Sequence, residues 1–226
     1  AVAHAHPRLG ALVLASREMT PSADATAAAL VAAIREGGGE RLPWDEATRA
    51  LHRRLAWLHR RLPEAWPAVA KASLLHDLES WLAPWLAGVR RLSELPSKAL
   101  AEAMLMRLEP AQRAALDRLA PGSWTTPLGQ SVAIDYGQDP PAIACRLQAR
   151  LGLDRRPTIL NGRQPLSLQL LSPADRPIQV TTDMPGFWRG SYALVRKELR
   201  GRYPRPPWPE NPLGASPWRP GMRRPD

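Results

Sequence analysis

The residue pattern changes at Pro121-Gly122, and this change divides the chain of 226 residues into two halves of different character. Before it, residues 1–120 are rich in Ala, Leu and Arg, with leucines recurring at intervals of three and four. After it, apolar and polar residues alternate, which is typical of half-buried strands. The sequence therefore predicts an α+β fold: a small helical bundle, then a small mixed α/β domain with a β-hairpin and an extended, basic, Pro-rich tail.

Four segments follow from this pattern. Residues 1–20 are expected to be the residual segment of an upstream domain, because the apolar stretch at 8–14 is a short strand or helix piece without an obvious partner before it. Residues 21–120 form the expected helical domain and residues 121–203 the mixed α+β domain. Residues 204–226 contain eight prolines and form the expected tail.

The helical half contains five predicted helices separated by proline and glycine. The clearest begins at Asp45, a good N-cap, and places Leu51, Leu55 and Leu58 on one face before Pro63 ends it. A pattern from residue 73 onwards contains Pro84, which predicts a kink or a break. The remaining predicted helices cover residues 22–36, 98–108 and 110–119. Short helices with short proline turns favour a small antiparallel bundle.

The second half contains predicted strands and one last helix. Alternation predicts strands around Val132–Tyr136 and Ile143–Cys145, and a hairpin whose strands flank a turn at 172–177. The final helix is expected over residues 187–200, stopped by Gly201. The residues expected on its apolar face are Trp188, Tyr192, Val195 and Leu199.

No residue constellation predicts a catalytic, cofactor or metal site. The glycines at 37–39 lack the Lys-Ser/Thr that follows a phosphate loop, which favours a linker. His4 and His6 have no third metal ligand nearby. His52 and His59 lie on an arginine-rich helix and are expected on a solvated face. A stand-alone enzyme therefore has no support in the sequence.

Two further features have structural explanations. Cys145, the single cysteine, lies in an apolar strand and is expected to be an inert core thiol, and its isolation excludes an internal disulfide framework. Asp135 and Asp139 flank a turn near Gly137, and turn chemistry explains them better than paired acid–base carboxylates.

Positive charge is concentrated at the C-terminal end. The chain has 31 Lys and Arg against 21 Asp and Glu, a net charge of +10, and residues 187–226 carry nine of these cations against three carboxylates. Such a segment gains affinity for phosphates by counterion release, and exposed aromatic rings stack on unpaired bases. The predicted RNA-contact residues are Arg189, Arg196, Lys197, Arg200, Arg202, Tyr203, Arg205 and Trp208. Arg189, Arg196 and Arg200 are expected to form one basic edge of the last helix, continued by Arg202 and Arg205 in the extended segment, with Tyr203 and Trp208 free to stack.

Two alternatives remain open for this segment. The arginines could instead pair with carboxylates such as Glu198 or Glu210, or dock on another domain. The Pro/Trp tail could also recruit a protein partner, because extended proline-rich segments are ligands for aromatic grooves. In that case the chain is a non-catalytic interaction module.

Several runs resemble a known family. They are LLSPADRPIQVT at 170–181, GFWRGSY at 186–192, VRKELRGRYP at 195–204, WPE at 208–210, WLAPWLAGVR at 81–90, LPW at 42–44 and RLGALVL at 8–14. Together they resemble the C-terminal region of HrpB-type bacterial ATP-dependent helicases, in the DEAH/DExH-box RNA helicase group. The departures are Arg205-Pro206, where the family usually reads Lys-His, and Asn211-Pro212, where it reads Asp-Pro.

The resemblance implies an accessory C-terminal module that contacts RNA, single-stranded RNA above all, or docks on RecA-like motor domains. In that family the motor domains hold ATP and Mg, and none of their motifs occurs in this sequence, so the chain alone is expected to be inactive. No apolar run reaches the roughly 18 residues that a membrane span needs, and no signal peptide pattern begins the chain. A cytoplasmic location is therefore expected.

Overall fold

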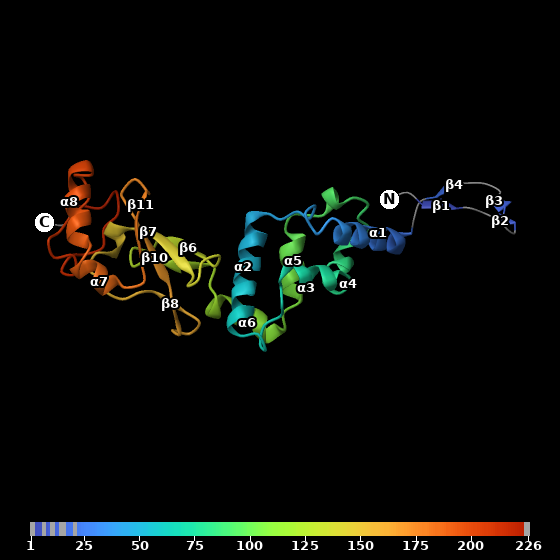
Figure 1. The fold of residues 1–226 in the computed structure, drawn as a ribbon, viewed down its shortest axis with the longest axis horizontal. Helices are drawn as coiled ribbons and strands as arrows, with labels where there is room; N and C mark the ends of the chain where they lie inside the picture. The colour runs from blue at the N-terminus through green and yellow to red at the C-terminus, as the bar shows by residue number, and fades with distance from the viewer. Residues whose placement is uncertain (1–2, 6–7, 10–11, 14–16, 20–21, 224–226) are drawn as a thin grey trace. The chain divides into compact units, whose positions relative to one another are not determined.

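The chain forms two compact units, residues 1–113 and 114–226. The computed structural model describes residues 3–5, 8–9, 12–13, 17–19 and 22–223, and Figure 1 shows the order of their helices and strands. The first unit is mainly helical and the second is built on a mixed sheet. The α+β class predicted from the sequence is therefore confirmed. The division between the units falls inside helix α6 (Pro110–Leu119).

Two short antiparallel pairs begin the first unit. Strand β1 (Ala3–Ala5) pairs with β4 (Arg17–Met19), and β2 (Arg8–Leu9) pairs with β3 (Leu12–Val13). The apolar stretch at 8–14 is thus a pair of strands that are partners for each other. The other residues of segment 1–20, His6 among them, lie outside the described residues.

Helices α1 and α2 begin at the residues that their capping chemistry predicts. Ser22 caps α1 (Ala23–Glu36) by accepting a hydrogen bond from the Ala25 amide at 3.1 Å. Asp45 caps α2 (Glu46–Arg61) by accepting one from the Thr48 amide at 2.7 Å. Both side chains satisfy amides that the first turn of a helix leaves without partners.

The three glycines after α1 close that helix. The amides of Gly37, Gly38 and Gly39 donate to the carbonyl oxygens of Ala33, Arg35 and Ile34, at 2.9–3.1 Å. Gly38 and Gly39 have φ of 57° and 75°, which favours glycine. These amides are therefore occupied by the helix end, and the run does not form a phosphate-binding loop.

The two histidines of α2 fasten the loop that follows it. Nε2 of His52 lies 2.6 Å from the carbonyl oxygen of Val69, and Nδ1 of His59 lies 2.8 Å from that of Trp66. A carbonyl can only accept, so each of these ring nitrogens donates. Both imidazoles are half-buried. The prediction of a solvated face is wrong here, because residues seven apart lie on one side of a helix and the loop 62–70 covers that side.

The rest of the first unit is a set of short helices around an apolar core. The pattern from residue 73 onwards is broken into three pieces, α3 (Lys71–His76), α4 (Leu78–Trp81) and the 3-10 turn η1 (Ala83–Leu86), with Pro84 in the first turn of η1. The 3-10 turn η2 (Leu92–Glu94) and helix α5 (Ala99–Met106) follow. The largest fully buried side chains include Trp57, Leu58, Leu78, Leu82, Leu100 and Met104.

A five-stranded sheet with the order β11-β10-β7-β6-β5 organises the second unit. Its strands are β5 (Ser123–Thr125), β6 (Ser131–Asp135), β7 (Ala142–Arg146), β10 (Ser167–Leu171) and β11 (Pro177–Thr181). Strands β7 and β10 are parallel, and the other neighbours are antiparallel. The segment between β7 and β10 holds the turn η3 (Leu147–Arg150) and a small pair, β8 (Thr158–Ile159) with β9 (Gln164–Pro165).

The alternation predicted from the sequence sets the core face of this sheet. Ile134 pairs with Ile143, and Leu168 and Leu170 are fully buried. Cys145 is 5% exposed, which confirms its place in the core. Burial raises the pKa of its thiol to about 11, which favours the unreactive protonated form at neutral pH. Asp135 accepts a hydrogen bond from the Gly137 amide at 2.8 Å, which confirms its role in the turn.

The predicted hairpin is β10 with β11. Its turn closes by a hydrogen bond of 2.8 Å from the Ser172 amide to the Arg176 carbonyl oxygen, and Asp175 in this turn has a φ of 57°. Arg146 of β7 donates twice to Asp175, at 2.7 and 2.6 Å. The guanidinium of Arg146 lowers the pKa of the Asp175 carboxyl. The turn is therefore tied to the neighbouring strand.

The predicted single helix over residues 187–200 is two helices. Helix α7 (Met184–Arg189) is capped by Asp183 and ends at Gly190, which has φ −109° and ψ −88°. Helix α8 (Tyr192–Arg202) then continues through Gly201. The prediction misplaced both the start and the stop, because Gly190 lies inside an uninterrupted apolar pattern and an exposed glycine near a helix end costs only about 1 kcal/mol.

The tail after α8 has neither helix nor strand over residues 203–223, and it packs against the rest of its unit. The Gly152 amide donates to the Pro212 carbonyl oxygen at 2.8 Å, and the Trp218 amide donates to that of Gln148 at 2.9 Å. Trp208 and Trp218 are 5% and 9% exposed. The tail is therefore irregular in structure and folds back on its unit, with its tryptophans turned inward.

Candidate nucleic-acid interface

Three cations of α8 are exposed and have no counter-charge. Lys197, Arg200 and Arg202 form neither a hydrogen bond nor an ion pair with any residue that the structure describes. All three lie in one helix of eleven residues, next to the start of the tail. They are free to contact an anionic ligand.

Arg196 is different from its neighbours. Its Nε donates to the Trp208 carbonyl oxygen at 2.8 Å, and its Nη2 donates to Oε1 of Glu210 at 2.9 Å. Its side chain is 23% exposed. Of the two explanations left open by the sequence, pairing with Glu210 is therefore the one seen for Arg196, which fastens the tail to α8.

The expected basic edge is interrupted, because α8 continues through Arg202, which was expected in the extended segment. At 100° per residue, Arg200 lies about 60° from Lys197 but about 160° from Arg202. Lys197 and Arg200 therefore share one side of α8, and Arg202 lies on the other side at the helix end. Arg189 belongs to α7 and is separated from α8 by the break at Gly190, although it too is exposed.

The two aromatic residues predicted to stack on bases differ in exposure. Tyr203 is half-buried, and no hydrogen bond of its hydroxyl is recorded among the described residues. Trp208 is 5% exposed, and its Nε1 donates to the Tyr203 carbonyl oxygen at 2.7 Å. The expectation that Trp208 is free to stack is wrong, because the tail folds back and turns its ring inward. Arg205 is exposed beside them.

An aromatic cluster packs at the start of α8. The rings of Phe187, Trp188 and Tyr192 are in mutual contact, with centroids 5.1 to 6.2 Å apart. The Tyr192 hydroxyl donates to the Pro209 carbonyl oxygen at 2.8 Å, and burial raises the pKa of Tyr192 to about 12. Trp188 donates to the Leu153 carbonyl oxygen at 2.8 Å. As predicted, Trp188 and Tyr192 belong to the core, so the helix that carries the cations is packed against the rest of its unit.

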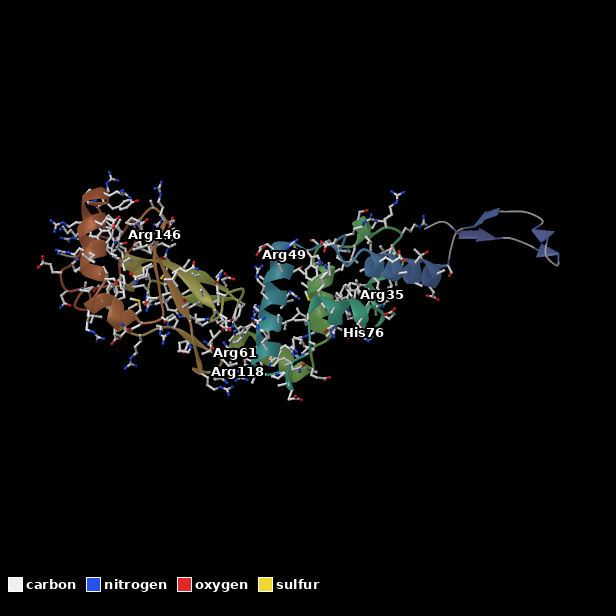
Figure 2. All side chains as sticks on the ribbon, in the orientation of Figure 1. Arg35, Arg49, Arg61, His76, Arg118 and Arg146 are labelled. Atoms are coloured by element: carbon white, nitrogen blue, oxygen red, sulfur yellow. The ribbon has the colours of Figure 1, made fainter. Side chains whose placement is uncertain are left out.

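Other arginines are held by partners. Figure 2 labels Arg35, which is paired with Glu79 at 2.8 Å, and Arg146, which is paired with Asp175 at 2.6 Å. Arg150 is 2% exposed and lies over the Trp124 ring, with 5.5 Å between its Cζ and the ring centroid. Burial lowers the pKa of Arg150. Exposed arginines without an ion pair also occur elsewhere in the described residues, Arg49 and Arg155 among them, but α8 places three unpaired cations within one helix.

The sequence reasoning missed the contacts that hold the tail. Gly152 has a φ of 72°, and a Cβ there would collide with the Ala215 carbonyl oxygen. The only sequence signal was the presence of tryptophans in a proline-rich segment, since large aromatic rings gain most from burial. Pairing across such distances along the chain leaves no local pattern.

The described part of the chain holds neither a metal-binding cluster nor a membrane-spanning helix. No group of three or more His, Cys, Asp or Glu side chains is placed to hold a metal ion. No described helix has the length and apolar content to cross a membrane.

Comparison with known proteins decides the family. The profile of the HrpB C-terminal family, described as ATP-dependent helicase C-terminal, matches residues 81–212, more than half of the chain. The chain belongs to the HrpB-type helicase C-terminal family. This confirms the resemblance seen in the sequence, including the runs at 81–90 and 170–210.

Known relatives of the HrpB C-terminal family extend the match to the first unit. The ATP-dependent RNA helicase HrpB of Escherichia coli is 42% identical over 201 residues, which cover 88% of this chain and 25% of that protein. A crystal structure of the E. coli DExH-box NTPase HrpB aligns with a TM-score of 0.82 and 40% identity, over 95% of this chain and 27% of that one.

A second crystal structure, of the E. coli DEAH/RHA helicase HrpB, aligns with a TM-score of 0.71 and 38% identity, over 89% of this chain and 26% of that one. The chain thus spans about a quarter of the length of these relatives. Its fold is the fold of their C-terminal part.

Proposed function

We propose that this chain is an accessory RNA-contact module of an ATP-dependent helicase, and that single-stranded RNA lies against α8 and the start of the tail. The observation that carries the proposal is the set of exposed, unpaired cations at Lys197, Arg200 and Arg202, beside the half-buried Tyr203. The matched E. coli relative is called an RNA helicase, which supports RNA as the ligand.

The physical basis is charge and stacking. Unpaired cations displace the counterions of phosphates, and each single-strand contact contributes about 0.7 to the slope of log affinity against log salt. Tyr203 offers an aromatic face to one base, and base stacking is tolerant of sequence. The expected binding is weak, sensitive to salt and indifferent to sequence.

ATP and Mg²⁺ are assigned to motor domains outside this chain. The glycine run at 37–39 does not offer its amides to the phosphates of a nucleoside triphosphate, because they are bonded to the end of α1. No phosphate-binding lysine motif follows that run. We therefore expect the chain alone to show no RNA-stimulated ATP hydrolysis.

The test is a triple variant, Lys197→Ala, Arg200→Ala and Arg202→Ala, titrated with fluorescently labelled single-stranded RNA at several salt concentrations. The matched control is Arg155→Ala, Arg163→Ala and Arg176→Ala, which removes the same charge from exposed residues of the same unit. The first variant should weaken binding and lower the salt slope by about 2. The control should retain most of both.

Equal effects of the two triple variants would reduce the interaction to net charge and overturn the proposed location. Unchanged RNA binding by the α8 variant would also overturn the proposed location. It would favour the alternative that these cations dock on the motor domains. Circular dichroism of both variants checks that the fold is retained.

A further inference from the structure

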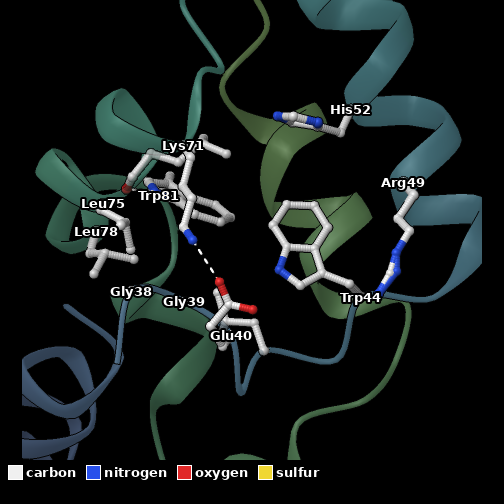
Figure 3. Close-up of a pocket in the computed structure, with 12 residues that line it drawn as sticks. Gly38, Gly39, Glu40, Trp44, Arg49, His52, Lys71, Leu75, Leu78 and Trp81 are labelled. Carbon is white, nitrogen blue, oxygen red and sulfur yellow. Dashed lines mark hydrogen bonds and ion pairs between the residues drawn. The ribbon is translucent and has the colours of Figure 1, made fainter. Parts of the chain in front are cut away.

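A cavity of about 330 Å³ lies within the first unit (Figure 3). It is bounded by the loop after α1 and the first half of α2 on one side, and by α3 and α4 on the other. Its apolar wall includes Leu42, Leu74 and Leu78, each at most 7% exposed. This volume is near the lower end of small-molecule sites, about 300 Å³, so the cavity has room for one ring system.

Two indole rings face the cavity from opposite sides (Figure 3). Trp81 donates its Nε1 hydrogen to the Leu74 carbonyl oxygen at 2.9 Å, which fixes the ring. Trp44 is half-buried, and its indole N–H has no hydrogen-bond partner among the residues that the structure describes. His52 stands edge-on to Trp44, with 5.5 Å between ring centroids. The cavity therefore has aromatic walls and one unused donor.

The mouth of the cavity carries two cations, Lys71 and Arg49, and one carboxylate, Glu40. Lys71 is paired with Glu40 at 2.7 Å, but both side chains are more than 60% exposed, and such pairs contribute little and open readily. Arg49 lines the cavity, is exposed and has no ion-pair partner in the described part of the chain. Arg49, Arg53 and Arg60 lie within about 40° on α2, and Arg53 is paired with Glu46 at 2.6 Å.

We propose that this cavity takes a single nucleobase, whose phosphate is held by one of the two cations at its mouth, Lys71 or Arg49. Aromatic walls stack on the face of any base, and the Trp44 N–H can donate to a ring nitrogen or carbonyl oxygen. The cationic mouth favours an anionic ligand over the neutral aromatic side chain of a peptide. The base can come from an unpaired nucleotide of RNA or from a free nucleotide. Only the first of these sources rests on the RNA contact proposed above.

The test follows the indole N–H signals of the full chain by NMR, with the Trp44 signal assigned from its loss in Trp44→Phe. The probes are adenosine monophosphate, ribose 5-phosphate, which lacks the base, and a short oligoadenylate. Adenosine monophosphate should shift the Trp44 signal saturably, and ribose 5-phosphate should not. Tighter binding of the oligoadenylate assigns RNA as the source, and equal binding assigns a free nucleotide.

Trp44→Ala should weaken the binding of adenosine monophosphate about tenfold or more, because a stacking face is lost. Trp85→Ala is the matched control, since Trp85 is also half-buried but does not line the cavity. Leu75→Phe fills the cavity without removing a tryptophan, and should block the probe even if Trp44→Ala fails to fold.

The proposal is overturned if neither base-containing probe shifts the Trp44 signal saturably. It is also overturned if ribose 5-phosphate shifts that signal as much as adenosine monophosphate does, because the cavity mouth would then be only an anion site. The α8 triple variant lies in the other unit and should keep the full response to adenosine monophosphate. The cavity and the α8 surface therefore fail or succeed separately.

Discussion

At the scale of single residues, a few positions decide how the second unit closes. Gly152 is one, because its positive φ and the approach of Ala215 leave no room for a side chain. Arg196 is another, because it donates hydrogen bonds to both Trp208 and Glu210. Its role is therefore structural, and not the phosphate contact predicted from the sequence. Composition alone ranked Arg196 with its neighbours, since nothing local in the sequence distinguishes a paired arginine from an unpaired one.

Gly152→Ala should lower the free energy of unfolding by about 3 kcal/mol, from left-handed strain and from the collision with the Ala215 carbonyl. Gly129→Ala is the control, because Gly129 also has a positive φ of 74° but faces open space. It should cost only the strain, about 1 kcal/mol. Urea unfolding of both variants measures the difference, and equal losses would show that the tail does not press against Gly152.

At the scale of elements, local patterns carried most of the prediction. Helices α1, α2, α5 and α6 and the β10–β11 hairpin were predicted because caps, turns and periodicity are local properties. The break at Gly190, the parallel pairing of β7 with β10 and the return of the tail were not, because they depend on packing between distant segments. For the same reason the exposed cations of α8 were found from composition, but the burial of Trp208 was not.

The contact between α8 and the tail should depend on alkaline pH through Tyr192. Its pKa is raised to about 12 in the folded chain, against an ordinary value of 10.0, so its contribution to stability is complete below pH 10 and is lost as pH rises towards 12. At neutral pH, Tyr192→Phe should cost about 1 kcal/mol through the lost hydrogen bond to Pro209.

This difference between wild type and Tyr192→Phe should shrink above pH 10 in urea unfolding. Tyr203→Phe serves as control, because no hydrogen bond of that hydroxyl is recorded in the described residues. If the difference in unfolding free energy between wild type and Tyr192→Phe stayed constant up to pH 12, the raised pKa of the buried Tyr192 phenol would be contradicted.

At the scale of the whole molecule, each unit carries one of the two surfaces proposed to contact a nucleic acid. The first has an aromatic cavity with a cationic mouth, and the second has unpaired cations on a helix that an aromatic cluster holds in place. The family was recognisable from sequence runs, whereas the cavity was not, because its walls come from four separate segments.

The most direct test of RNA contact by α8 is photochemical cross-linking to a short oligouridylate that carries 4-thiouridine. Cleavage after Glu198 and Glu210 releases residues 199–210, which mass spectrometry can identify with or without an attached nucleotide. The expected result is a cross-link within this peptide, at or next to Tyr203, that is lost in the α8 triple variant and kept in the charge-matched control. Cross-links confined to other peptides, or equally strong in both variants, would contradict the account.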